Sequence, residues 1–307
     1  MRRLFIAPDG RLNLFWRLLS YMFLYYVALL LSQFLQELVT GVPRTHPFGG
    51  LLSSGLAVAF TVGLTWLFRT RVDRRPLRSI GLLPLRGWLG QLLIGFIAGV
   101  LLMGLVFGIE YAAGWLKVTA FEPARSGWGP ALSSVLGGLV FAVTPGFTEE
   151  VVMRGYWFQN LAEGRRLWVA SLVVSVVFAL LHFGEFGPWM LTFIPSVLII
   201  STGLILSRLV TGSLWLAIGW HTAWDFAQWS VFGISPLWNT HPLIAARMTG
   251  PAWLVGPIGM PEEGLLGIAV EALGVAILLG YMAWKGIRID WRATTSPDDP
   301  AAGSRCA

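Results

Sequence analysis

TPGFTEEVVMRGYWFQN (residues 144–160) places two adjacent glutamates and an arginine inside an otherwise apolar part of the chain. A charged side chain at the centre of a membrane helix costs roughly 2.5 to 3.5 kcal/mol on insertion scales, so such groups usually face one another or a wet cavity. If the surrounding sequence spans a membrane, this stretch therefore marks a functional site.

The composition of the whole chain is that of a membrane protein. Hydrophobic residues make up 55% of the 307 residues, charged residues make up only 12%, and the mean hydropathy is +0.68. A soluble domain usually has about a quarter charged residues, so a water-soluble globular protein is excluded. The formal net charge of +6 is interpreted as a topology signal, and no nucleic-acid partner is expected. The single cysteine, Cys306, rules out an intrachain disulfide.

Apolar stretches predict an all-α, polytopic membrane protein with about eight transmembrane helices that enclose a polar intramembrane cavity. Each stretch is near or above the ~20 residues needed to cross a hydrocarbon core about 30 Å thick. The predicted spans lie at 14–39, 50–69, 88–115, 131–160, 167–184, 189–207, 213–232 and 264–285.

The positive charges predict how these spans are oriented. With the N-terminus inside, all but four of the 22 Lys and Arg residues fall on the inner side; the exceptions are Arg44, Lys117, Arg125 and Arg247. Lys and Arg are enriched in cytoplasmic loops. The sequence therefore predicts an integral multi-pass membrane protein whose N- and C-termini are both cytoplasmic.

The chain divides into four parts. Residues 1–130 hold the first transmembrane helices and a basic cytoplasmic loop, and residues 131–235 form a core with ionisable residues inside its spans. Residues 236–288 hold the last span, preceded by a long outside loop rich in Pro, Gly and Trp that runs over 233–263. The composition of residues 289–307 is typical of a disordered tail.

Ionisable residues inside the core spans are the candidates for function. They are Glu149, Glu150, Arg154, His182, His221 and Asp225. Glu149 lies as far before the polar turn at Arg165 and Arg166 as His182 lies after it. In an antiparallel helical hairpin both side chains then lie about 24 Å above the turn, at a rise of 1.5 Å per residue. A carboxylate and an imidazole are therefore predicted at the same depth.

Helical spacing predicts different surroundings for the two glutamates. Glu150 and Arg154 are four residues apart with the acid first, which is the favourable order for an ion pair. Glu149 is turned by about 100° from Glu150 on the same helix, which leaves its carboxylate available to a substrate or to water. His221 and Asp225 are also four residues apart and share one helix face.

Pro145 and Gly146 directly precede the two glutamates. These residues are expected to weaken the helix and to release backbone hydrogen-bonding groups. Membranes tolerate such irregular backbone where it lines a cavity, so a weakened helix is predicted beside the site.

Three motifs carry a resemblance to a known family. EEVVMR (Glu149–Arg154), FALLH (Phe178–His182) and HTAWD (His221–Asp225) are similar, in this order, to the EExxxR, FxxxH and HxxxN/D motifs of the CAAX protease and bacteriocin-processing (CPBP, or Abi) family. This family includes the type II CAAX prenyl endopeptidases, which are glutamate-dependent intramembrane proteases with eight helices. The resemblance covers about residues 130–235 and identifies the 131–235 core as a catalytic core of this type.

The resemblance implies an intramembrane endopeptidase that hydrolyses a peptide or membrane-associated protein at the lipid bilayer, with CAAX-type maturation as an expected role. It also implies a prokaryotic plasma membrane as the location. The catalytic residues that it implies are Glu149 as general base, His182 beside the same water, and His221 with Asp225 on the oxyanion side. The supporting residues that it implies are Glu150, Arg154 and Phe178.

The third motif departs from the prenyl endopeptidases, which have Asn at the position of Asp225. An amide can donate a hydrogen bond that an ionised carboxylate cannot. Either Asp225 is protonated in its apolar surroundings, or it orients His221 and leaves hydrogen-bond donation to the imidazole. The Asp in place of Asn therefore bears more on whether the substrate is a prenylated CAAX protein than on the fold.

Other interpretations stay open. The side chains of Glu149, His182, His221 and Asp225 could hold Zn²⁺ as His₂Glu hydrolytic sites do, but the sequence has no H-E-x-x-H motif, so no cofactor is assigned. A non-catalytic membrane immunity or scaffold protein of the Abi type could bind a partner with the same cavity. A proton-coupled transporter also explains intramembrane carboxylates, but no internal repeat is found.

Overall fold

The computed structural model describes residues 2–41, 47–83, 86–182, 190–234, 242–257, 260–295 and 304–306. Helices dominate this part of the chain, so the predicted all-α class is confirmed. The α-helices are α1 (Arg2–Phe5), α2 (Leu14–Thr40), α3 (Pro47–Leu67), α4 (Trp88–Ala112), α5 (Glu122–Ser126), α6 (Trp128–Glu149), α7 (Phe158–Gly164), α8 (Leu167–Leu181), α10 (Met190–Thr211), α11 (Trp215–Phe226), α12 (Ala252–Val255) and α13 (Leu265–Lys285).

Shorter elements complete the described chain. The strands are β1 (Leu116–Phe121), β2 (Ile244–Met248), β3 (Ile287–Ile289) and β4 (Ser304–Cys306). The π-helical segments are Phe68–Val72, Glu150–Trp157 and Ala227–Val231, and the 3₁₀-helices are Leu77–Ile80 and Pro261–Glu263.

Six helical runs in the described residues are long and apolar enough to cross a membrane. They are Leu14–Thr40, Gly49–Val72, Trp88–Ala112, Trp128–Gly164, Phe193–Thr211 and Leu265–Lys285. Large apolar side chains point outward from these runs, including Leu30, Ile94 and Ile277, each more than half exposed. Such surfaces suit lipid rather than water, so the chain is a polytopic membrane protein. α8 and α11 occupy the two other predicted spans and are shorter; the number of spans and the orientation of the termini stay predictions.

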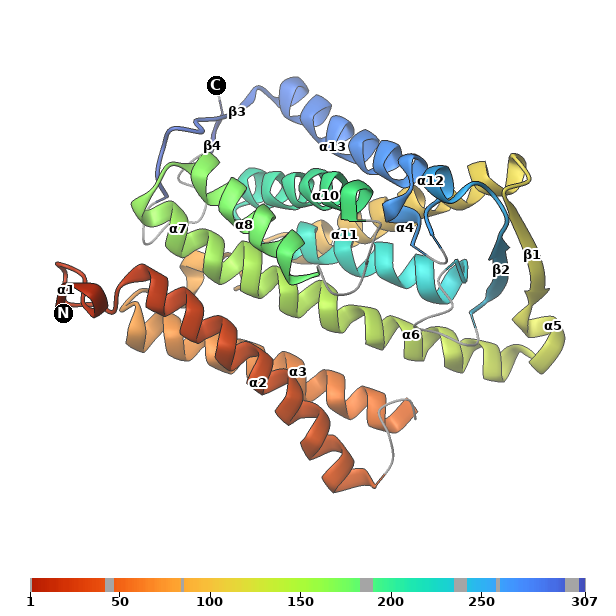
Figure 1. Ribbon diagram of the computed structural model, residues 1–307, viewed down its shortest axis with the longest axis horizontal. Coiled ribbons are helices and arrows are strands. Elements are labelled where there is room, and N and C mark those ends of the chain that lie inside the picture. The colour runs from red at the N-terminus through yellow and green to blue at the C-terminus, as the bar shows by residue number, and fades with distance from the viewer. Residues whose placement is uncertain are drawn as a thin grey trace.

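α11 lies inside the bundle and packs against α4, α6 and α10 (Figure 1). Glycines let its backbone approach α4 closely. A Cβ atom at Gly219 would lie 2.2 Å from the carbonyl oxygen of Leu92, and one at Gly95 would lie 2.2 Å from that of Leu216. Small residues allow this close approach between membrane helices. The packing of α4 on α11 therefore fixes the helix that carries two of the candidate site residues.

α6 runs without a break through Pro145, beside which the sequence predicts a weakened helix. The helix continues into the π-helical segment Glu150–Trp157 and then into α7. The irregular backbone thus begins at Glu150, after Pro145 and Gly146 rather than at them. Gly146 has a packing role instead, because a Cβ atom there would lie 2.2 Å from Oγ1 of Thr222 on α11.

Replacing Gly146 by Ala is expected to lower the unfolding temperature, because the added Cβ would also lie 2.7 Å from the backbone nitrogen of Thr222 and would push α6 away from α11. Overpacking of this kind typically costs about 1–3 kcal/mol. Gly137→Ala on the same helix is the matched control, because nothing lies within 4 Å of its added Cβ. Equal unfolding temperatures for both variants in lipid nanodiscs would contradict the close contact of the two helices.

Residues 233–263, expected to form a long loop, contain regular structure. β2 pairs antiparallel with β1, and α12 and the 3₁₀-helix Pro261–Glu263 follow. The two strands lie at the opposite end of the bundle from the N-terminus (Figure 1). Residues 235–241 and 258–259 of the expected loop lie outside the described residues. The described part of the loop therefore lies at one end of the bundle.

The segment expected to be a disordered tail also begins with docked residues. The backbone N–H of Leu167 donates to the carbonyl oxygen of Ala293 at 3.0 Å, and the N–H of Thr295 donates to that of Ala162 at 3.0 Å. The first bond satisfies an amide at the start of α8, which has no partner within its own helix. The expectation of disorder is therefore wrong for residues 289–295; residues 296–303 and 307 lie outside the described chain.

Candidate active site

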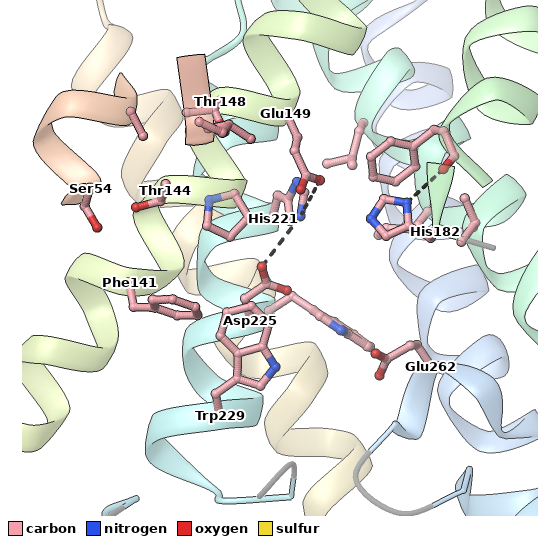
Figure 2. Close-up of a pocket in the computed structure, with 18 of the residues that line it drawn as sticks. Ser54, Phe141, Thr144, Thr148, Glu149, His182, His221, Asp225, Trp229 and Glu262 are labelled. Atoms are coloured by element: carbon pink, nitrogen blue, oxygen red, sulfur yellow. Dashed lines mark hydrogen bonds and ion pairs between the residues drawn. The ribbon is translucent and has the colours of Figure 1, made fainter. Parts of the chain in front are cut away.

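A cavity of about 420 Å³ lies inside the helical bundle. Its lining includes Glu149 at the end of α6, His182 directly after α8, and His221 and Asp225 on α11 (Figure 2). Side chains of α2, α3, α10 and α13 also line it. The three sequence motifs therefore meet at one cavity, as the hairpin geometry predicts for Glu149 and His182. The chemical roles of these residues stay a prediction.

His221 lies between the acidic groups of the cavity. Nδ1 of its ring is 2.9 Å from Oε1 of Glu150, whereas Nε2 is 3.6 Å from Oδ2 of Asp225 and 3.9 Å from Oε2 of Glu149. A carboxylate accepts hydrogen bonds, so we assign the proton of the neutral ring to Nδ1 and the lone pair to Nε2. Glu150 thereby orients the ring so that Nε2 faces the other two carboxyl groups.

Glu150 has two partners on a single oxygen. Oε1 accepts a hydrogen bond from Nη1 of Arg154 at 2.9 Å and another from Nδ1 of His221 at 2.9 Å. The side chains of Glu150 and Arg154 are both 0% exposed. The ion pair predicted from their spacing is thus confirmed. The bond to His221 is not predicted by spacing, which identifies partners only within one helix.

Glu149 is placed differently although it is the next residue back. Its side chain is 25% exposed, against 0% for Glu150, and points into the cavity (Figure 2). Among the described residues, its ion-pair partner is His221 rather than an arginine or a lysine. Its carboxylate is therefore accessible from the cavity, in agreement with the rotation of about 100° between adjacent helix positions.

Phe178 connects the basic groups around the cavity. Nδ1 of His182 donates to the carbonyl oxygen of Phe178 at 2.8 Å, so the lone pair of the neutral ring lies on Nε2. The Phe178 ring is 4.6 Å from the ring of His182 and 6.5 Å from that of His221, between centroids. The guanidinium of Arg154 lies 4.4 Å above the same ring, a favourable cation–π arrangement. Phe178 therefore packs the three motifs against one another.

Arg208 on α10 stabilises the π-helical segment that follows the glutamates. Its guanidinium donates to the backbone carbonyl oxygens of Arg154 and Gly155 and, at 2.7 Å, to Oε1 of Gln159. A π-helical turn departs from the regular α-helical hydrogen-bond pattern, and an arginine offers five donors to satisfy displaced carbonyl groups. Spacing along the sequence does not predict this role of Arg208, because its partners lie far away along the chain.

Two further carboxylic acids line the cavity and are missed by motif spacing. Oε2 of Glu271 accepts from Oγ of Ser196 at 2.7 Å, and Oε2 of Glu262 accepts from Nε2 of Gln228 at 3.1 Å. Glu262 precedes α13 and lies outside the spanning segments, and burial raises its pKa to about 7. A fraction of Glu262 side chains is therefore protonated at neutral pH. The packing of α13 and of the 3₁₀-helix Pro261–Glu263 against α10 brings these acids to the cavity.

The side chains of the site include types that can bind a metal ion, namely His, Asp and Glu. Among the described residues, no group of three or more His, Cys, Asp or Glu side chains could hold a metal ion. Nδ1 of His221 is hydrogen-bonded to Glu150 and Nδ1 of His182 to a backbone carbonyl, so Nε2 is the atom of each ring that could contact a metal ion. In the arrangement described, the candidate site residues are therefore not grouped as a set of three or more metal ligands.

Comparison with known proteins gives a match over the part of the chain that holds the candidate site residues. Residues 130–227 match the family model described as type II CAAX prenyl endopeptidase Rce1-like. No curated protein and no solved structure matches the chain. The matched range nearly coincides with the one that carries the motif resemblance, and it includes Glu149, His182, His221 and Asp225. Residues 130–227 are therefore similar to the Rce1-like type II CAAX prenyl endopeptidases, which is consistent with the CAAX protease (CPBP) family.

Proposed function

We propose that this membrane protein is a CAAX-type endopeptidase that hydrolyses a peptide bond inside the cavity, with Glu149 as the general base. The observation that carries the proposal is the approach of Glu149 Oε2 and His221 Nε2 to 3.9 Å in a cavity that His182 and Asp225 also line. This separation is too long for a direct hydrogen bond. It leaves space for a water molecule or a carbonyl oxygen to contact both groups.

The first step of the proposed reaction is activation of water. The carboxylate of Glu149 accepts one proton of the water, and the lone pair on Nε2 of His182 accepts a hydrogen bond from the other hydrogen. The water oxygen then attacks the carbonyl carbon, which forms a C–O bond and a tetrahedral oxyanion. General base catalysis of this kind contributes typically 10²–10⁴-fold to the rate.

The second step needs a donor for the oxyanion and a proton for the leaving group. When the His221 ring is protonated, Nδ1–H donates to Glu150 and Nε2–H donates to the oxyanion, beside Asp225. Donors of this kind are worth about 10²–10³-fold. The C–N bond breaks as the oxyanion collapses, and the proton held by Glu149 passes to the leaving amine. Atoms and charge balance without a further reactant.

The lining of the cavity suits a peptide with an apolar group. Its volume of about 420 Å³ falls in the range of small-molecule and peptide pockets. Phe141 and Trp229 form an aromatic pair on the wall, 5.6 Å apart between ring centroids, with Tyr25 and Leu29 of α2 also in the lining. These side chains support a membrane-associated substrate whose lipid or apolar side chain enters from the bilayer, as in CAAX-type maturation.

Replacing Asp225 by Asn is expected to keep kcat/KM within about tenfold of the native value, whereas Asp225→Ala should lower it by about 10²–10³-fold. Asn has the size of Asp and offers an N–H donor beside Nε2 of His221, which Ala does not. The measurement is the cleavage rate of a fluorogenic peptide by each variant in nanodiscs. An Asn variant as inactive as the Ala variant would show that Asp225 acts through its negative charge.

The proposal is tested with purified protein in lipid nanodiscs and two peptides of one CAAX-type sequence, one with a prenylated cysteine and one without. Mass spectrometry of the products identifies the bond that is cut. The expected result is cleavage of an internal peptide bond, faster for the prenylated peptide and unchanged by a zinc chelator. Cleavage that a chelator abolishes and added zinc restores would contradict the metal-free mechanism. A folded native protein that cuts neither peptide would contradict the CAAX-type substrate class.

A further inference from the structure

A second cavity lies at the end of the bundle where α2 begins. Its volume is about 930 Å³, and it shares no lining residue with the first cavity. The walls come from residues 6–14, from the first turn of α2 and from the C-terminal end of α7. Figure 1 shows the starts of α1 and α2 and the end of α7 on the same side of the molecule. Because α2 is a membrane-spanning run, the cavity lies at the level where the chain enters the membrane.

The side chains around this cavity carry an excess of positive charge. Its charged lining residues are Arg11, Arg17, Arg75 and Arg165 with Asp9 and Glu163. Asp9 is paired with Arg11 at 2.7 Å, and Glu163 is 3.5 Å from Nε of Arg75 and is also paired with Arg69 behind the wall. In the described part of the chain, Arg165 has no ion-pair partner and is exposed. The lining therefore retains positive charge that an anion could neutralise.

Arg17 provides a buried donor at this cavity. The residue is 6% exposed, and its Nη1 donates to Oδ1 of Asp73 at 2.9 Å and to Oδ1 of Asn160 at 2.9 Å. Its Nε atom is buried and has no hydrogen-bond partner among the described residues, whereas Nε of Arg75 has the carboxylate of Glu163 at 3.5 Å. A buried donor without an acceptor is unfavourable, so Nε of Arg17 favours a ligand that brings an oxygen acceptor.

A phosphate group has the chemistry that these donors require. Guanidinium groups bind phosphate through paired N–H donors, with charge and geometry both matched. Asn13 and Leu14, at the N-terminal end of α2, also line the cavity, and the dipole of this long helix favours negative charge there. Basic pockets at the ends of membrane helices bind anionic headgroups. A phosphate at this position would also neutralise charge at the membrane surface.

We propose that the cavity between residues 6–14, α2 and the end of α7 is a binding site for a phosphate group, supplied by an anionic phospholipid headgroup or by phosphate in solution. The site is separate from the proposed active site and does not depend on the protein being a protease. Its occupation ties the N-terminal segment to α7, which belongs to the same helical run as the candidate catalytic glutamates.

The unfolding temperature of the native protein distinguishes the two sources of the phosphate. Thermal unfolding is monitored by tryptophan fluorescence. The three samples are nanodiscs of phosphatidylcholine alone, the same nanodiscs with added phosphatidylglycerol, and phosphatidylcholine nanodiscs with added inorganic phosphate at constant ionic strength. A saturable rise with phosphatidylglycerol alone identifies a lipid headgroup, and an equal rise with inorganic phosphate identifies phosphate in solution. No rise with either would overturn the proposal.

Variants that change the charge of the lining test the location of the site. Arg165→Gln and Arg75→Gln should each weaken the affinity for the phosphate group roughly fivefold, because each removes one positive charge from the lining of the cavity. Asp9→Asn should strengthen it, because Asp9 competes for Arg11. Arg17 is left intact because it also holds Asp73. The first two variants and the third act in opposite directions, which a general loss of stability would not produce.

Arg125→Gln is the matched control for these variants. Arg125 is 66% exposed on α5, at the opposite end of the bundle (Figure 1). Its replacement removes one positive charge from the protein without touching the cavity, so the affinity should stay unchanged. An equal loss of affinity in Arg125→Gln and Arg165→Gln would show that the anion responds to overall charge and would overturn the assigned site.

Discussion

Glu149→Gln is expected to lower kcat/KM for peptide cleavage by about 10²–10⁴-fold, the largest catalytic effect of any single replacement in this account. Gln has nearly the same size as Glu but has no carboxylate to accept a proton from water. The side chain of Glu149 is 25% exposed, and in the described chain no arginine or lysine pairs with it. The unfolding temperature should therefore stay close to the native value.

Glu110→Gln is the matched control for the loss of a carboxyl group within the membrane. Glu110 on α4 is 0% exposed and does not line the catalytic cavity. Its replacement should leave the cleavage rate at the native value, measured with the same fluorogenic peptide in the same nanodiscs. A Glu149→Gln variant that cleaves at the native rate would remove Glu149 from the mechanism.

Glu150→Gln is expected to destabilise the protein by about 3–5 kcal/mol. The replacement is the same as in Glu149→Gln and lies only one residue further along the chain. Glu150 and Arg154 are both 0% exposed, and the neutral amide would leave the buried guanidinium without a counter-charge. Nε and Nη2 of Arg154 already have no hydrogen-bond partner among the described residues. The hydrogen bond that orients His221 also loses its charged acceptor, so activity should fall together with stability.

Thermal unfolding of the two adjacent variants in identical nanodiscs separates these roles. Glu149→Gln should unfold at the native temperature, and Glu150→Gln should unfold well below it. The double variant Glu150→Gln/Arg154→Met removes both buried charges and should recover much of the lost stability, because a buried charge is costly mainly when its partner is missing. A native unfolding temperature for Glu150→Gln would contradict the assignment of Glu150 as the counter-ion of Arg154.

Local patterns in the sequence predict the helices and one contact of the site. The span predicted at 264–285 is observed as Leu265–Lys285, because a long apolar run bounded by polar residues has few alternatives in a membrane. The pair Glu150–Arg154 follows from spacing within a single helix. The convergence of Glu149 and His182 on one cavity follows from the length of the hairpin that joins them.

Contacts between helices are beyond these patterns. Spacing does not predict that Glu150 also binds His221, or that Arg208 holds the π-helical segment from another helix. Pro145 shows how tertiary packing overrides a local rule. The helix continues through it, and the neighbouring Gly146 serves the close contact with Thr222 rather than a break. The pairing of β1 with β2 is missed for a similar reason, because its two strands lie far apart in the chain.

The central claim, that the protein cuts peptide bonds through Glu149, is tested most directly by comparing peptide termini in host membranes that contain either the native protein or Glu149→Gln. Immunoblotting checks that the two proteins are present at equal levels, and mass spectrometry identifies the termini. We expect a set of new termini that occurs only with the native protein and that names the substrate. Identical termini in both membranes, with a CAAX-type substrate expressed, would contradict the claim and favour a non-catalytic binding role for the same cavity.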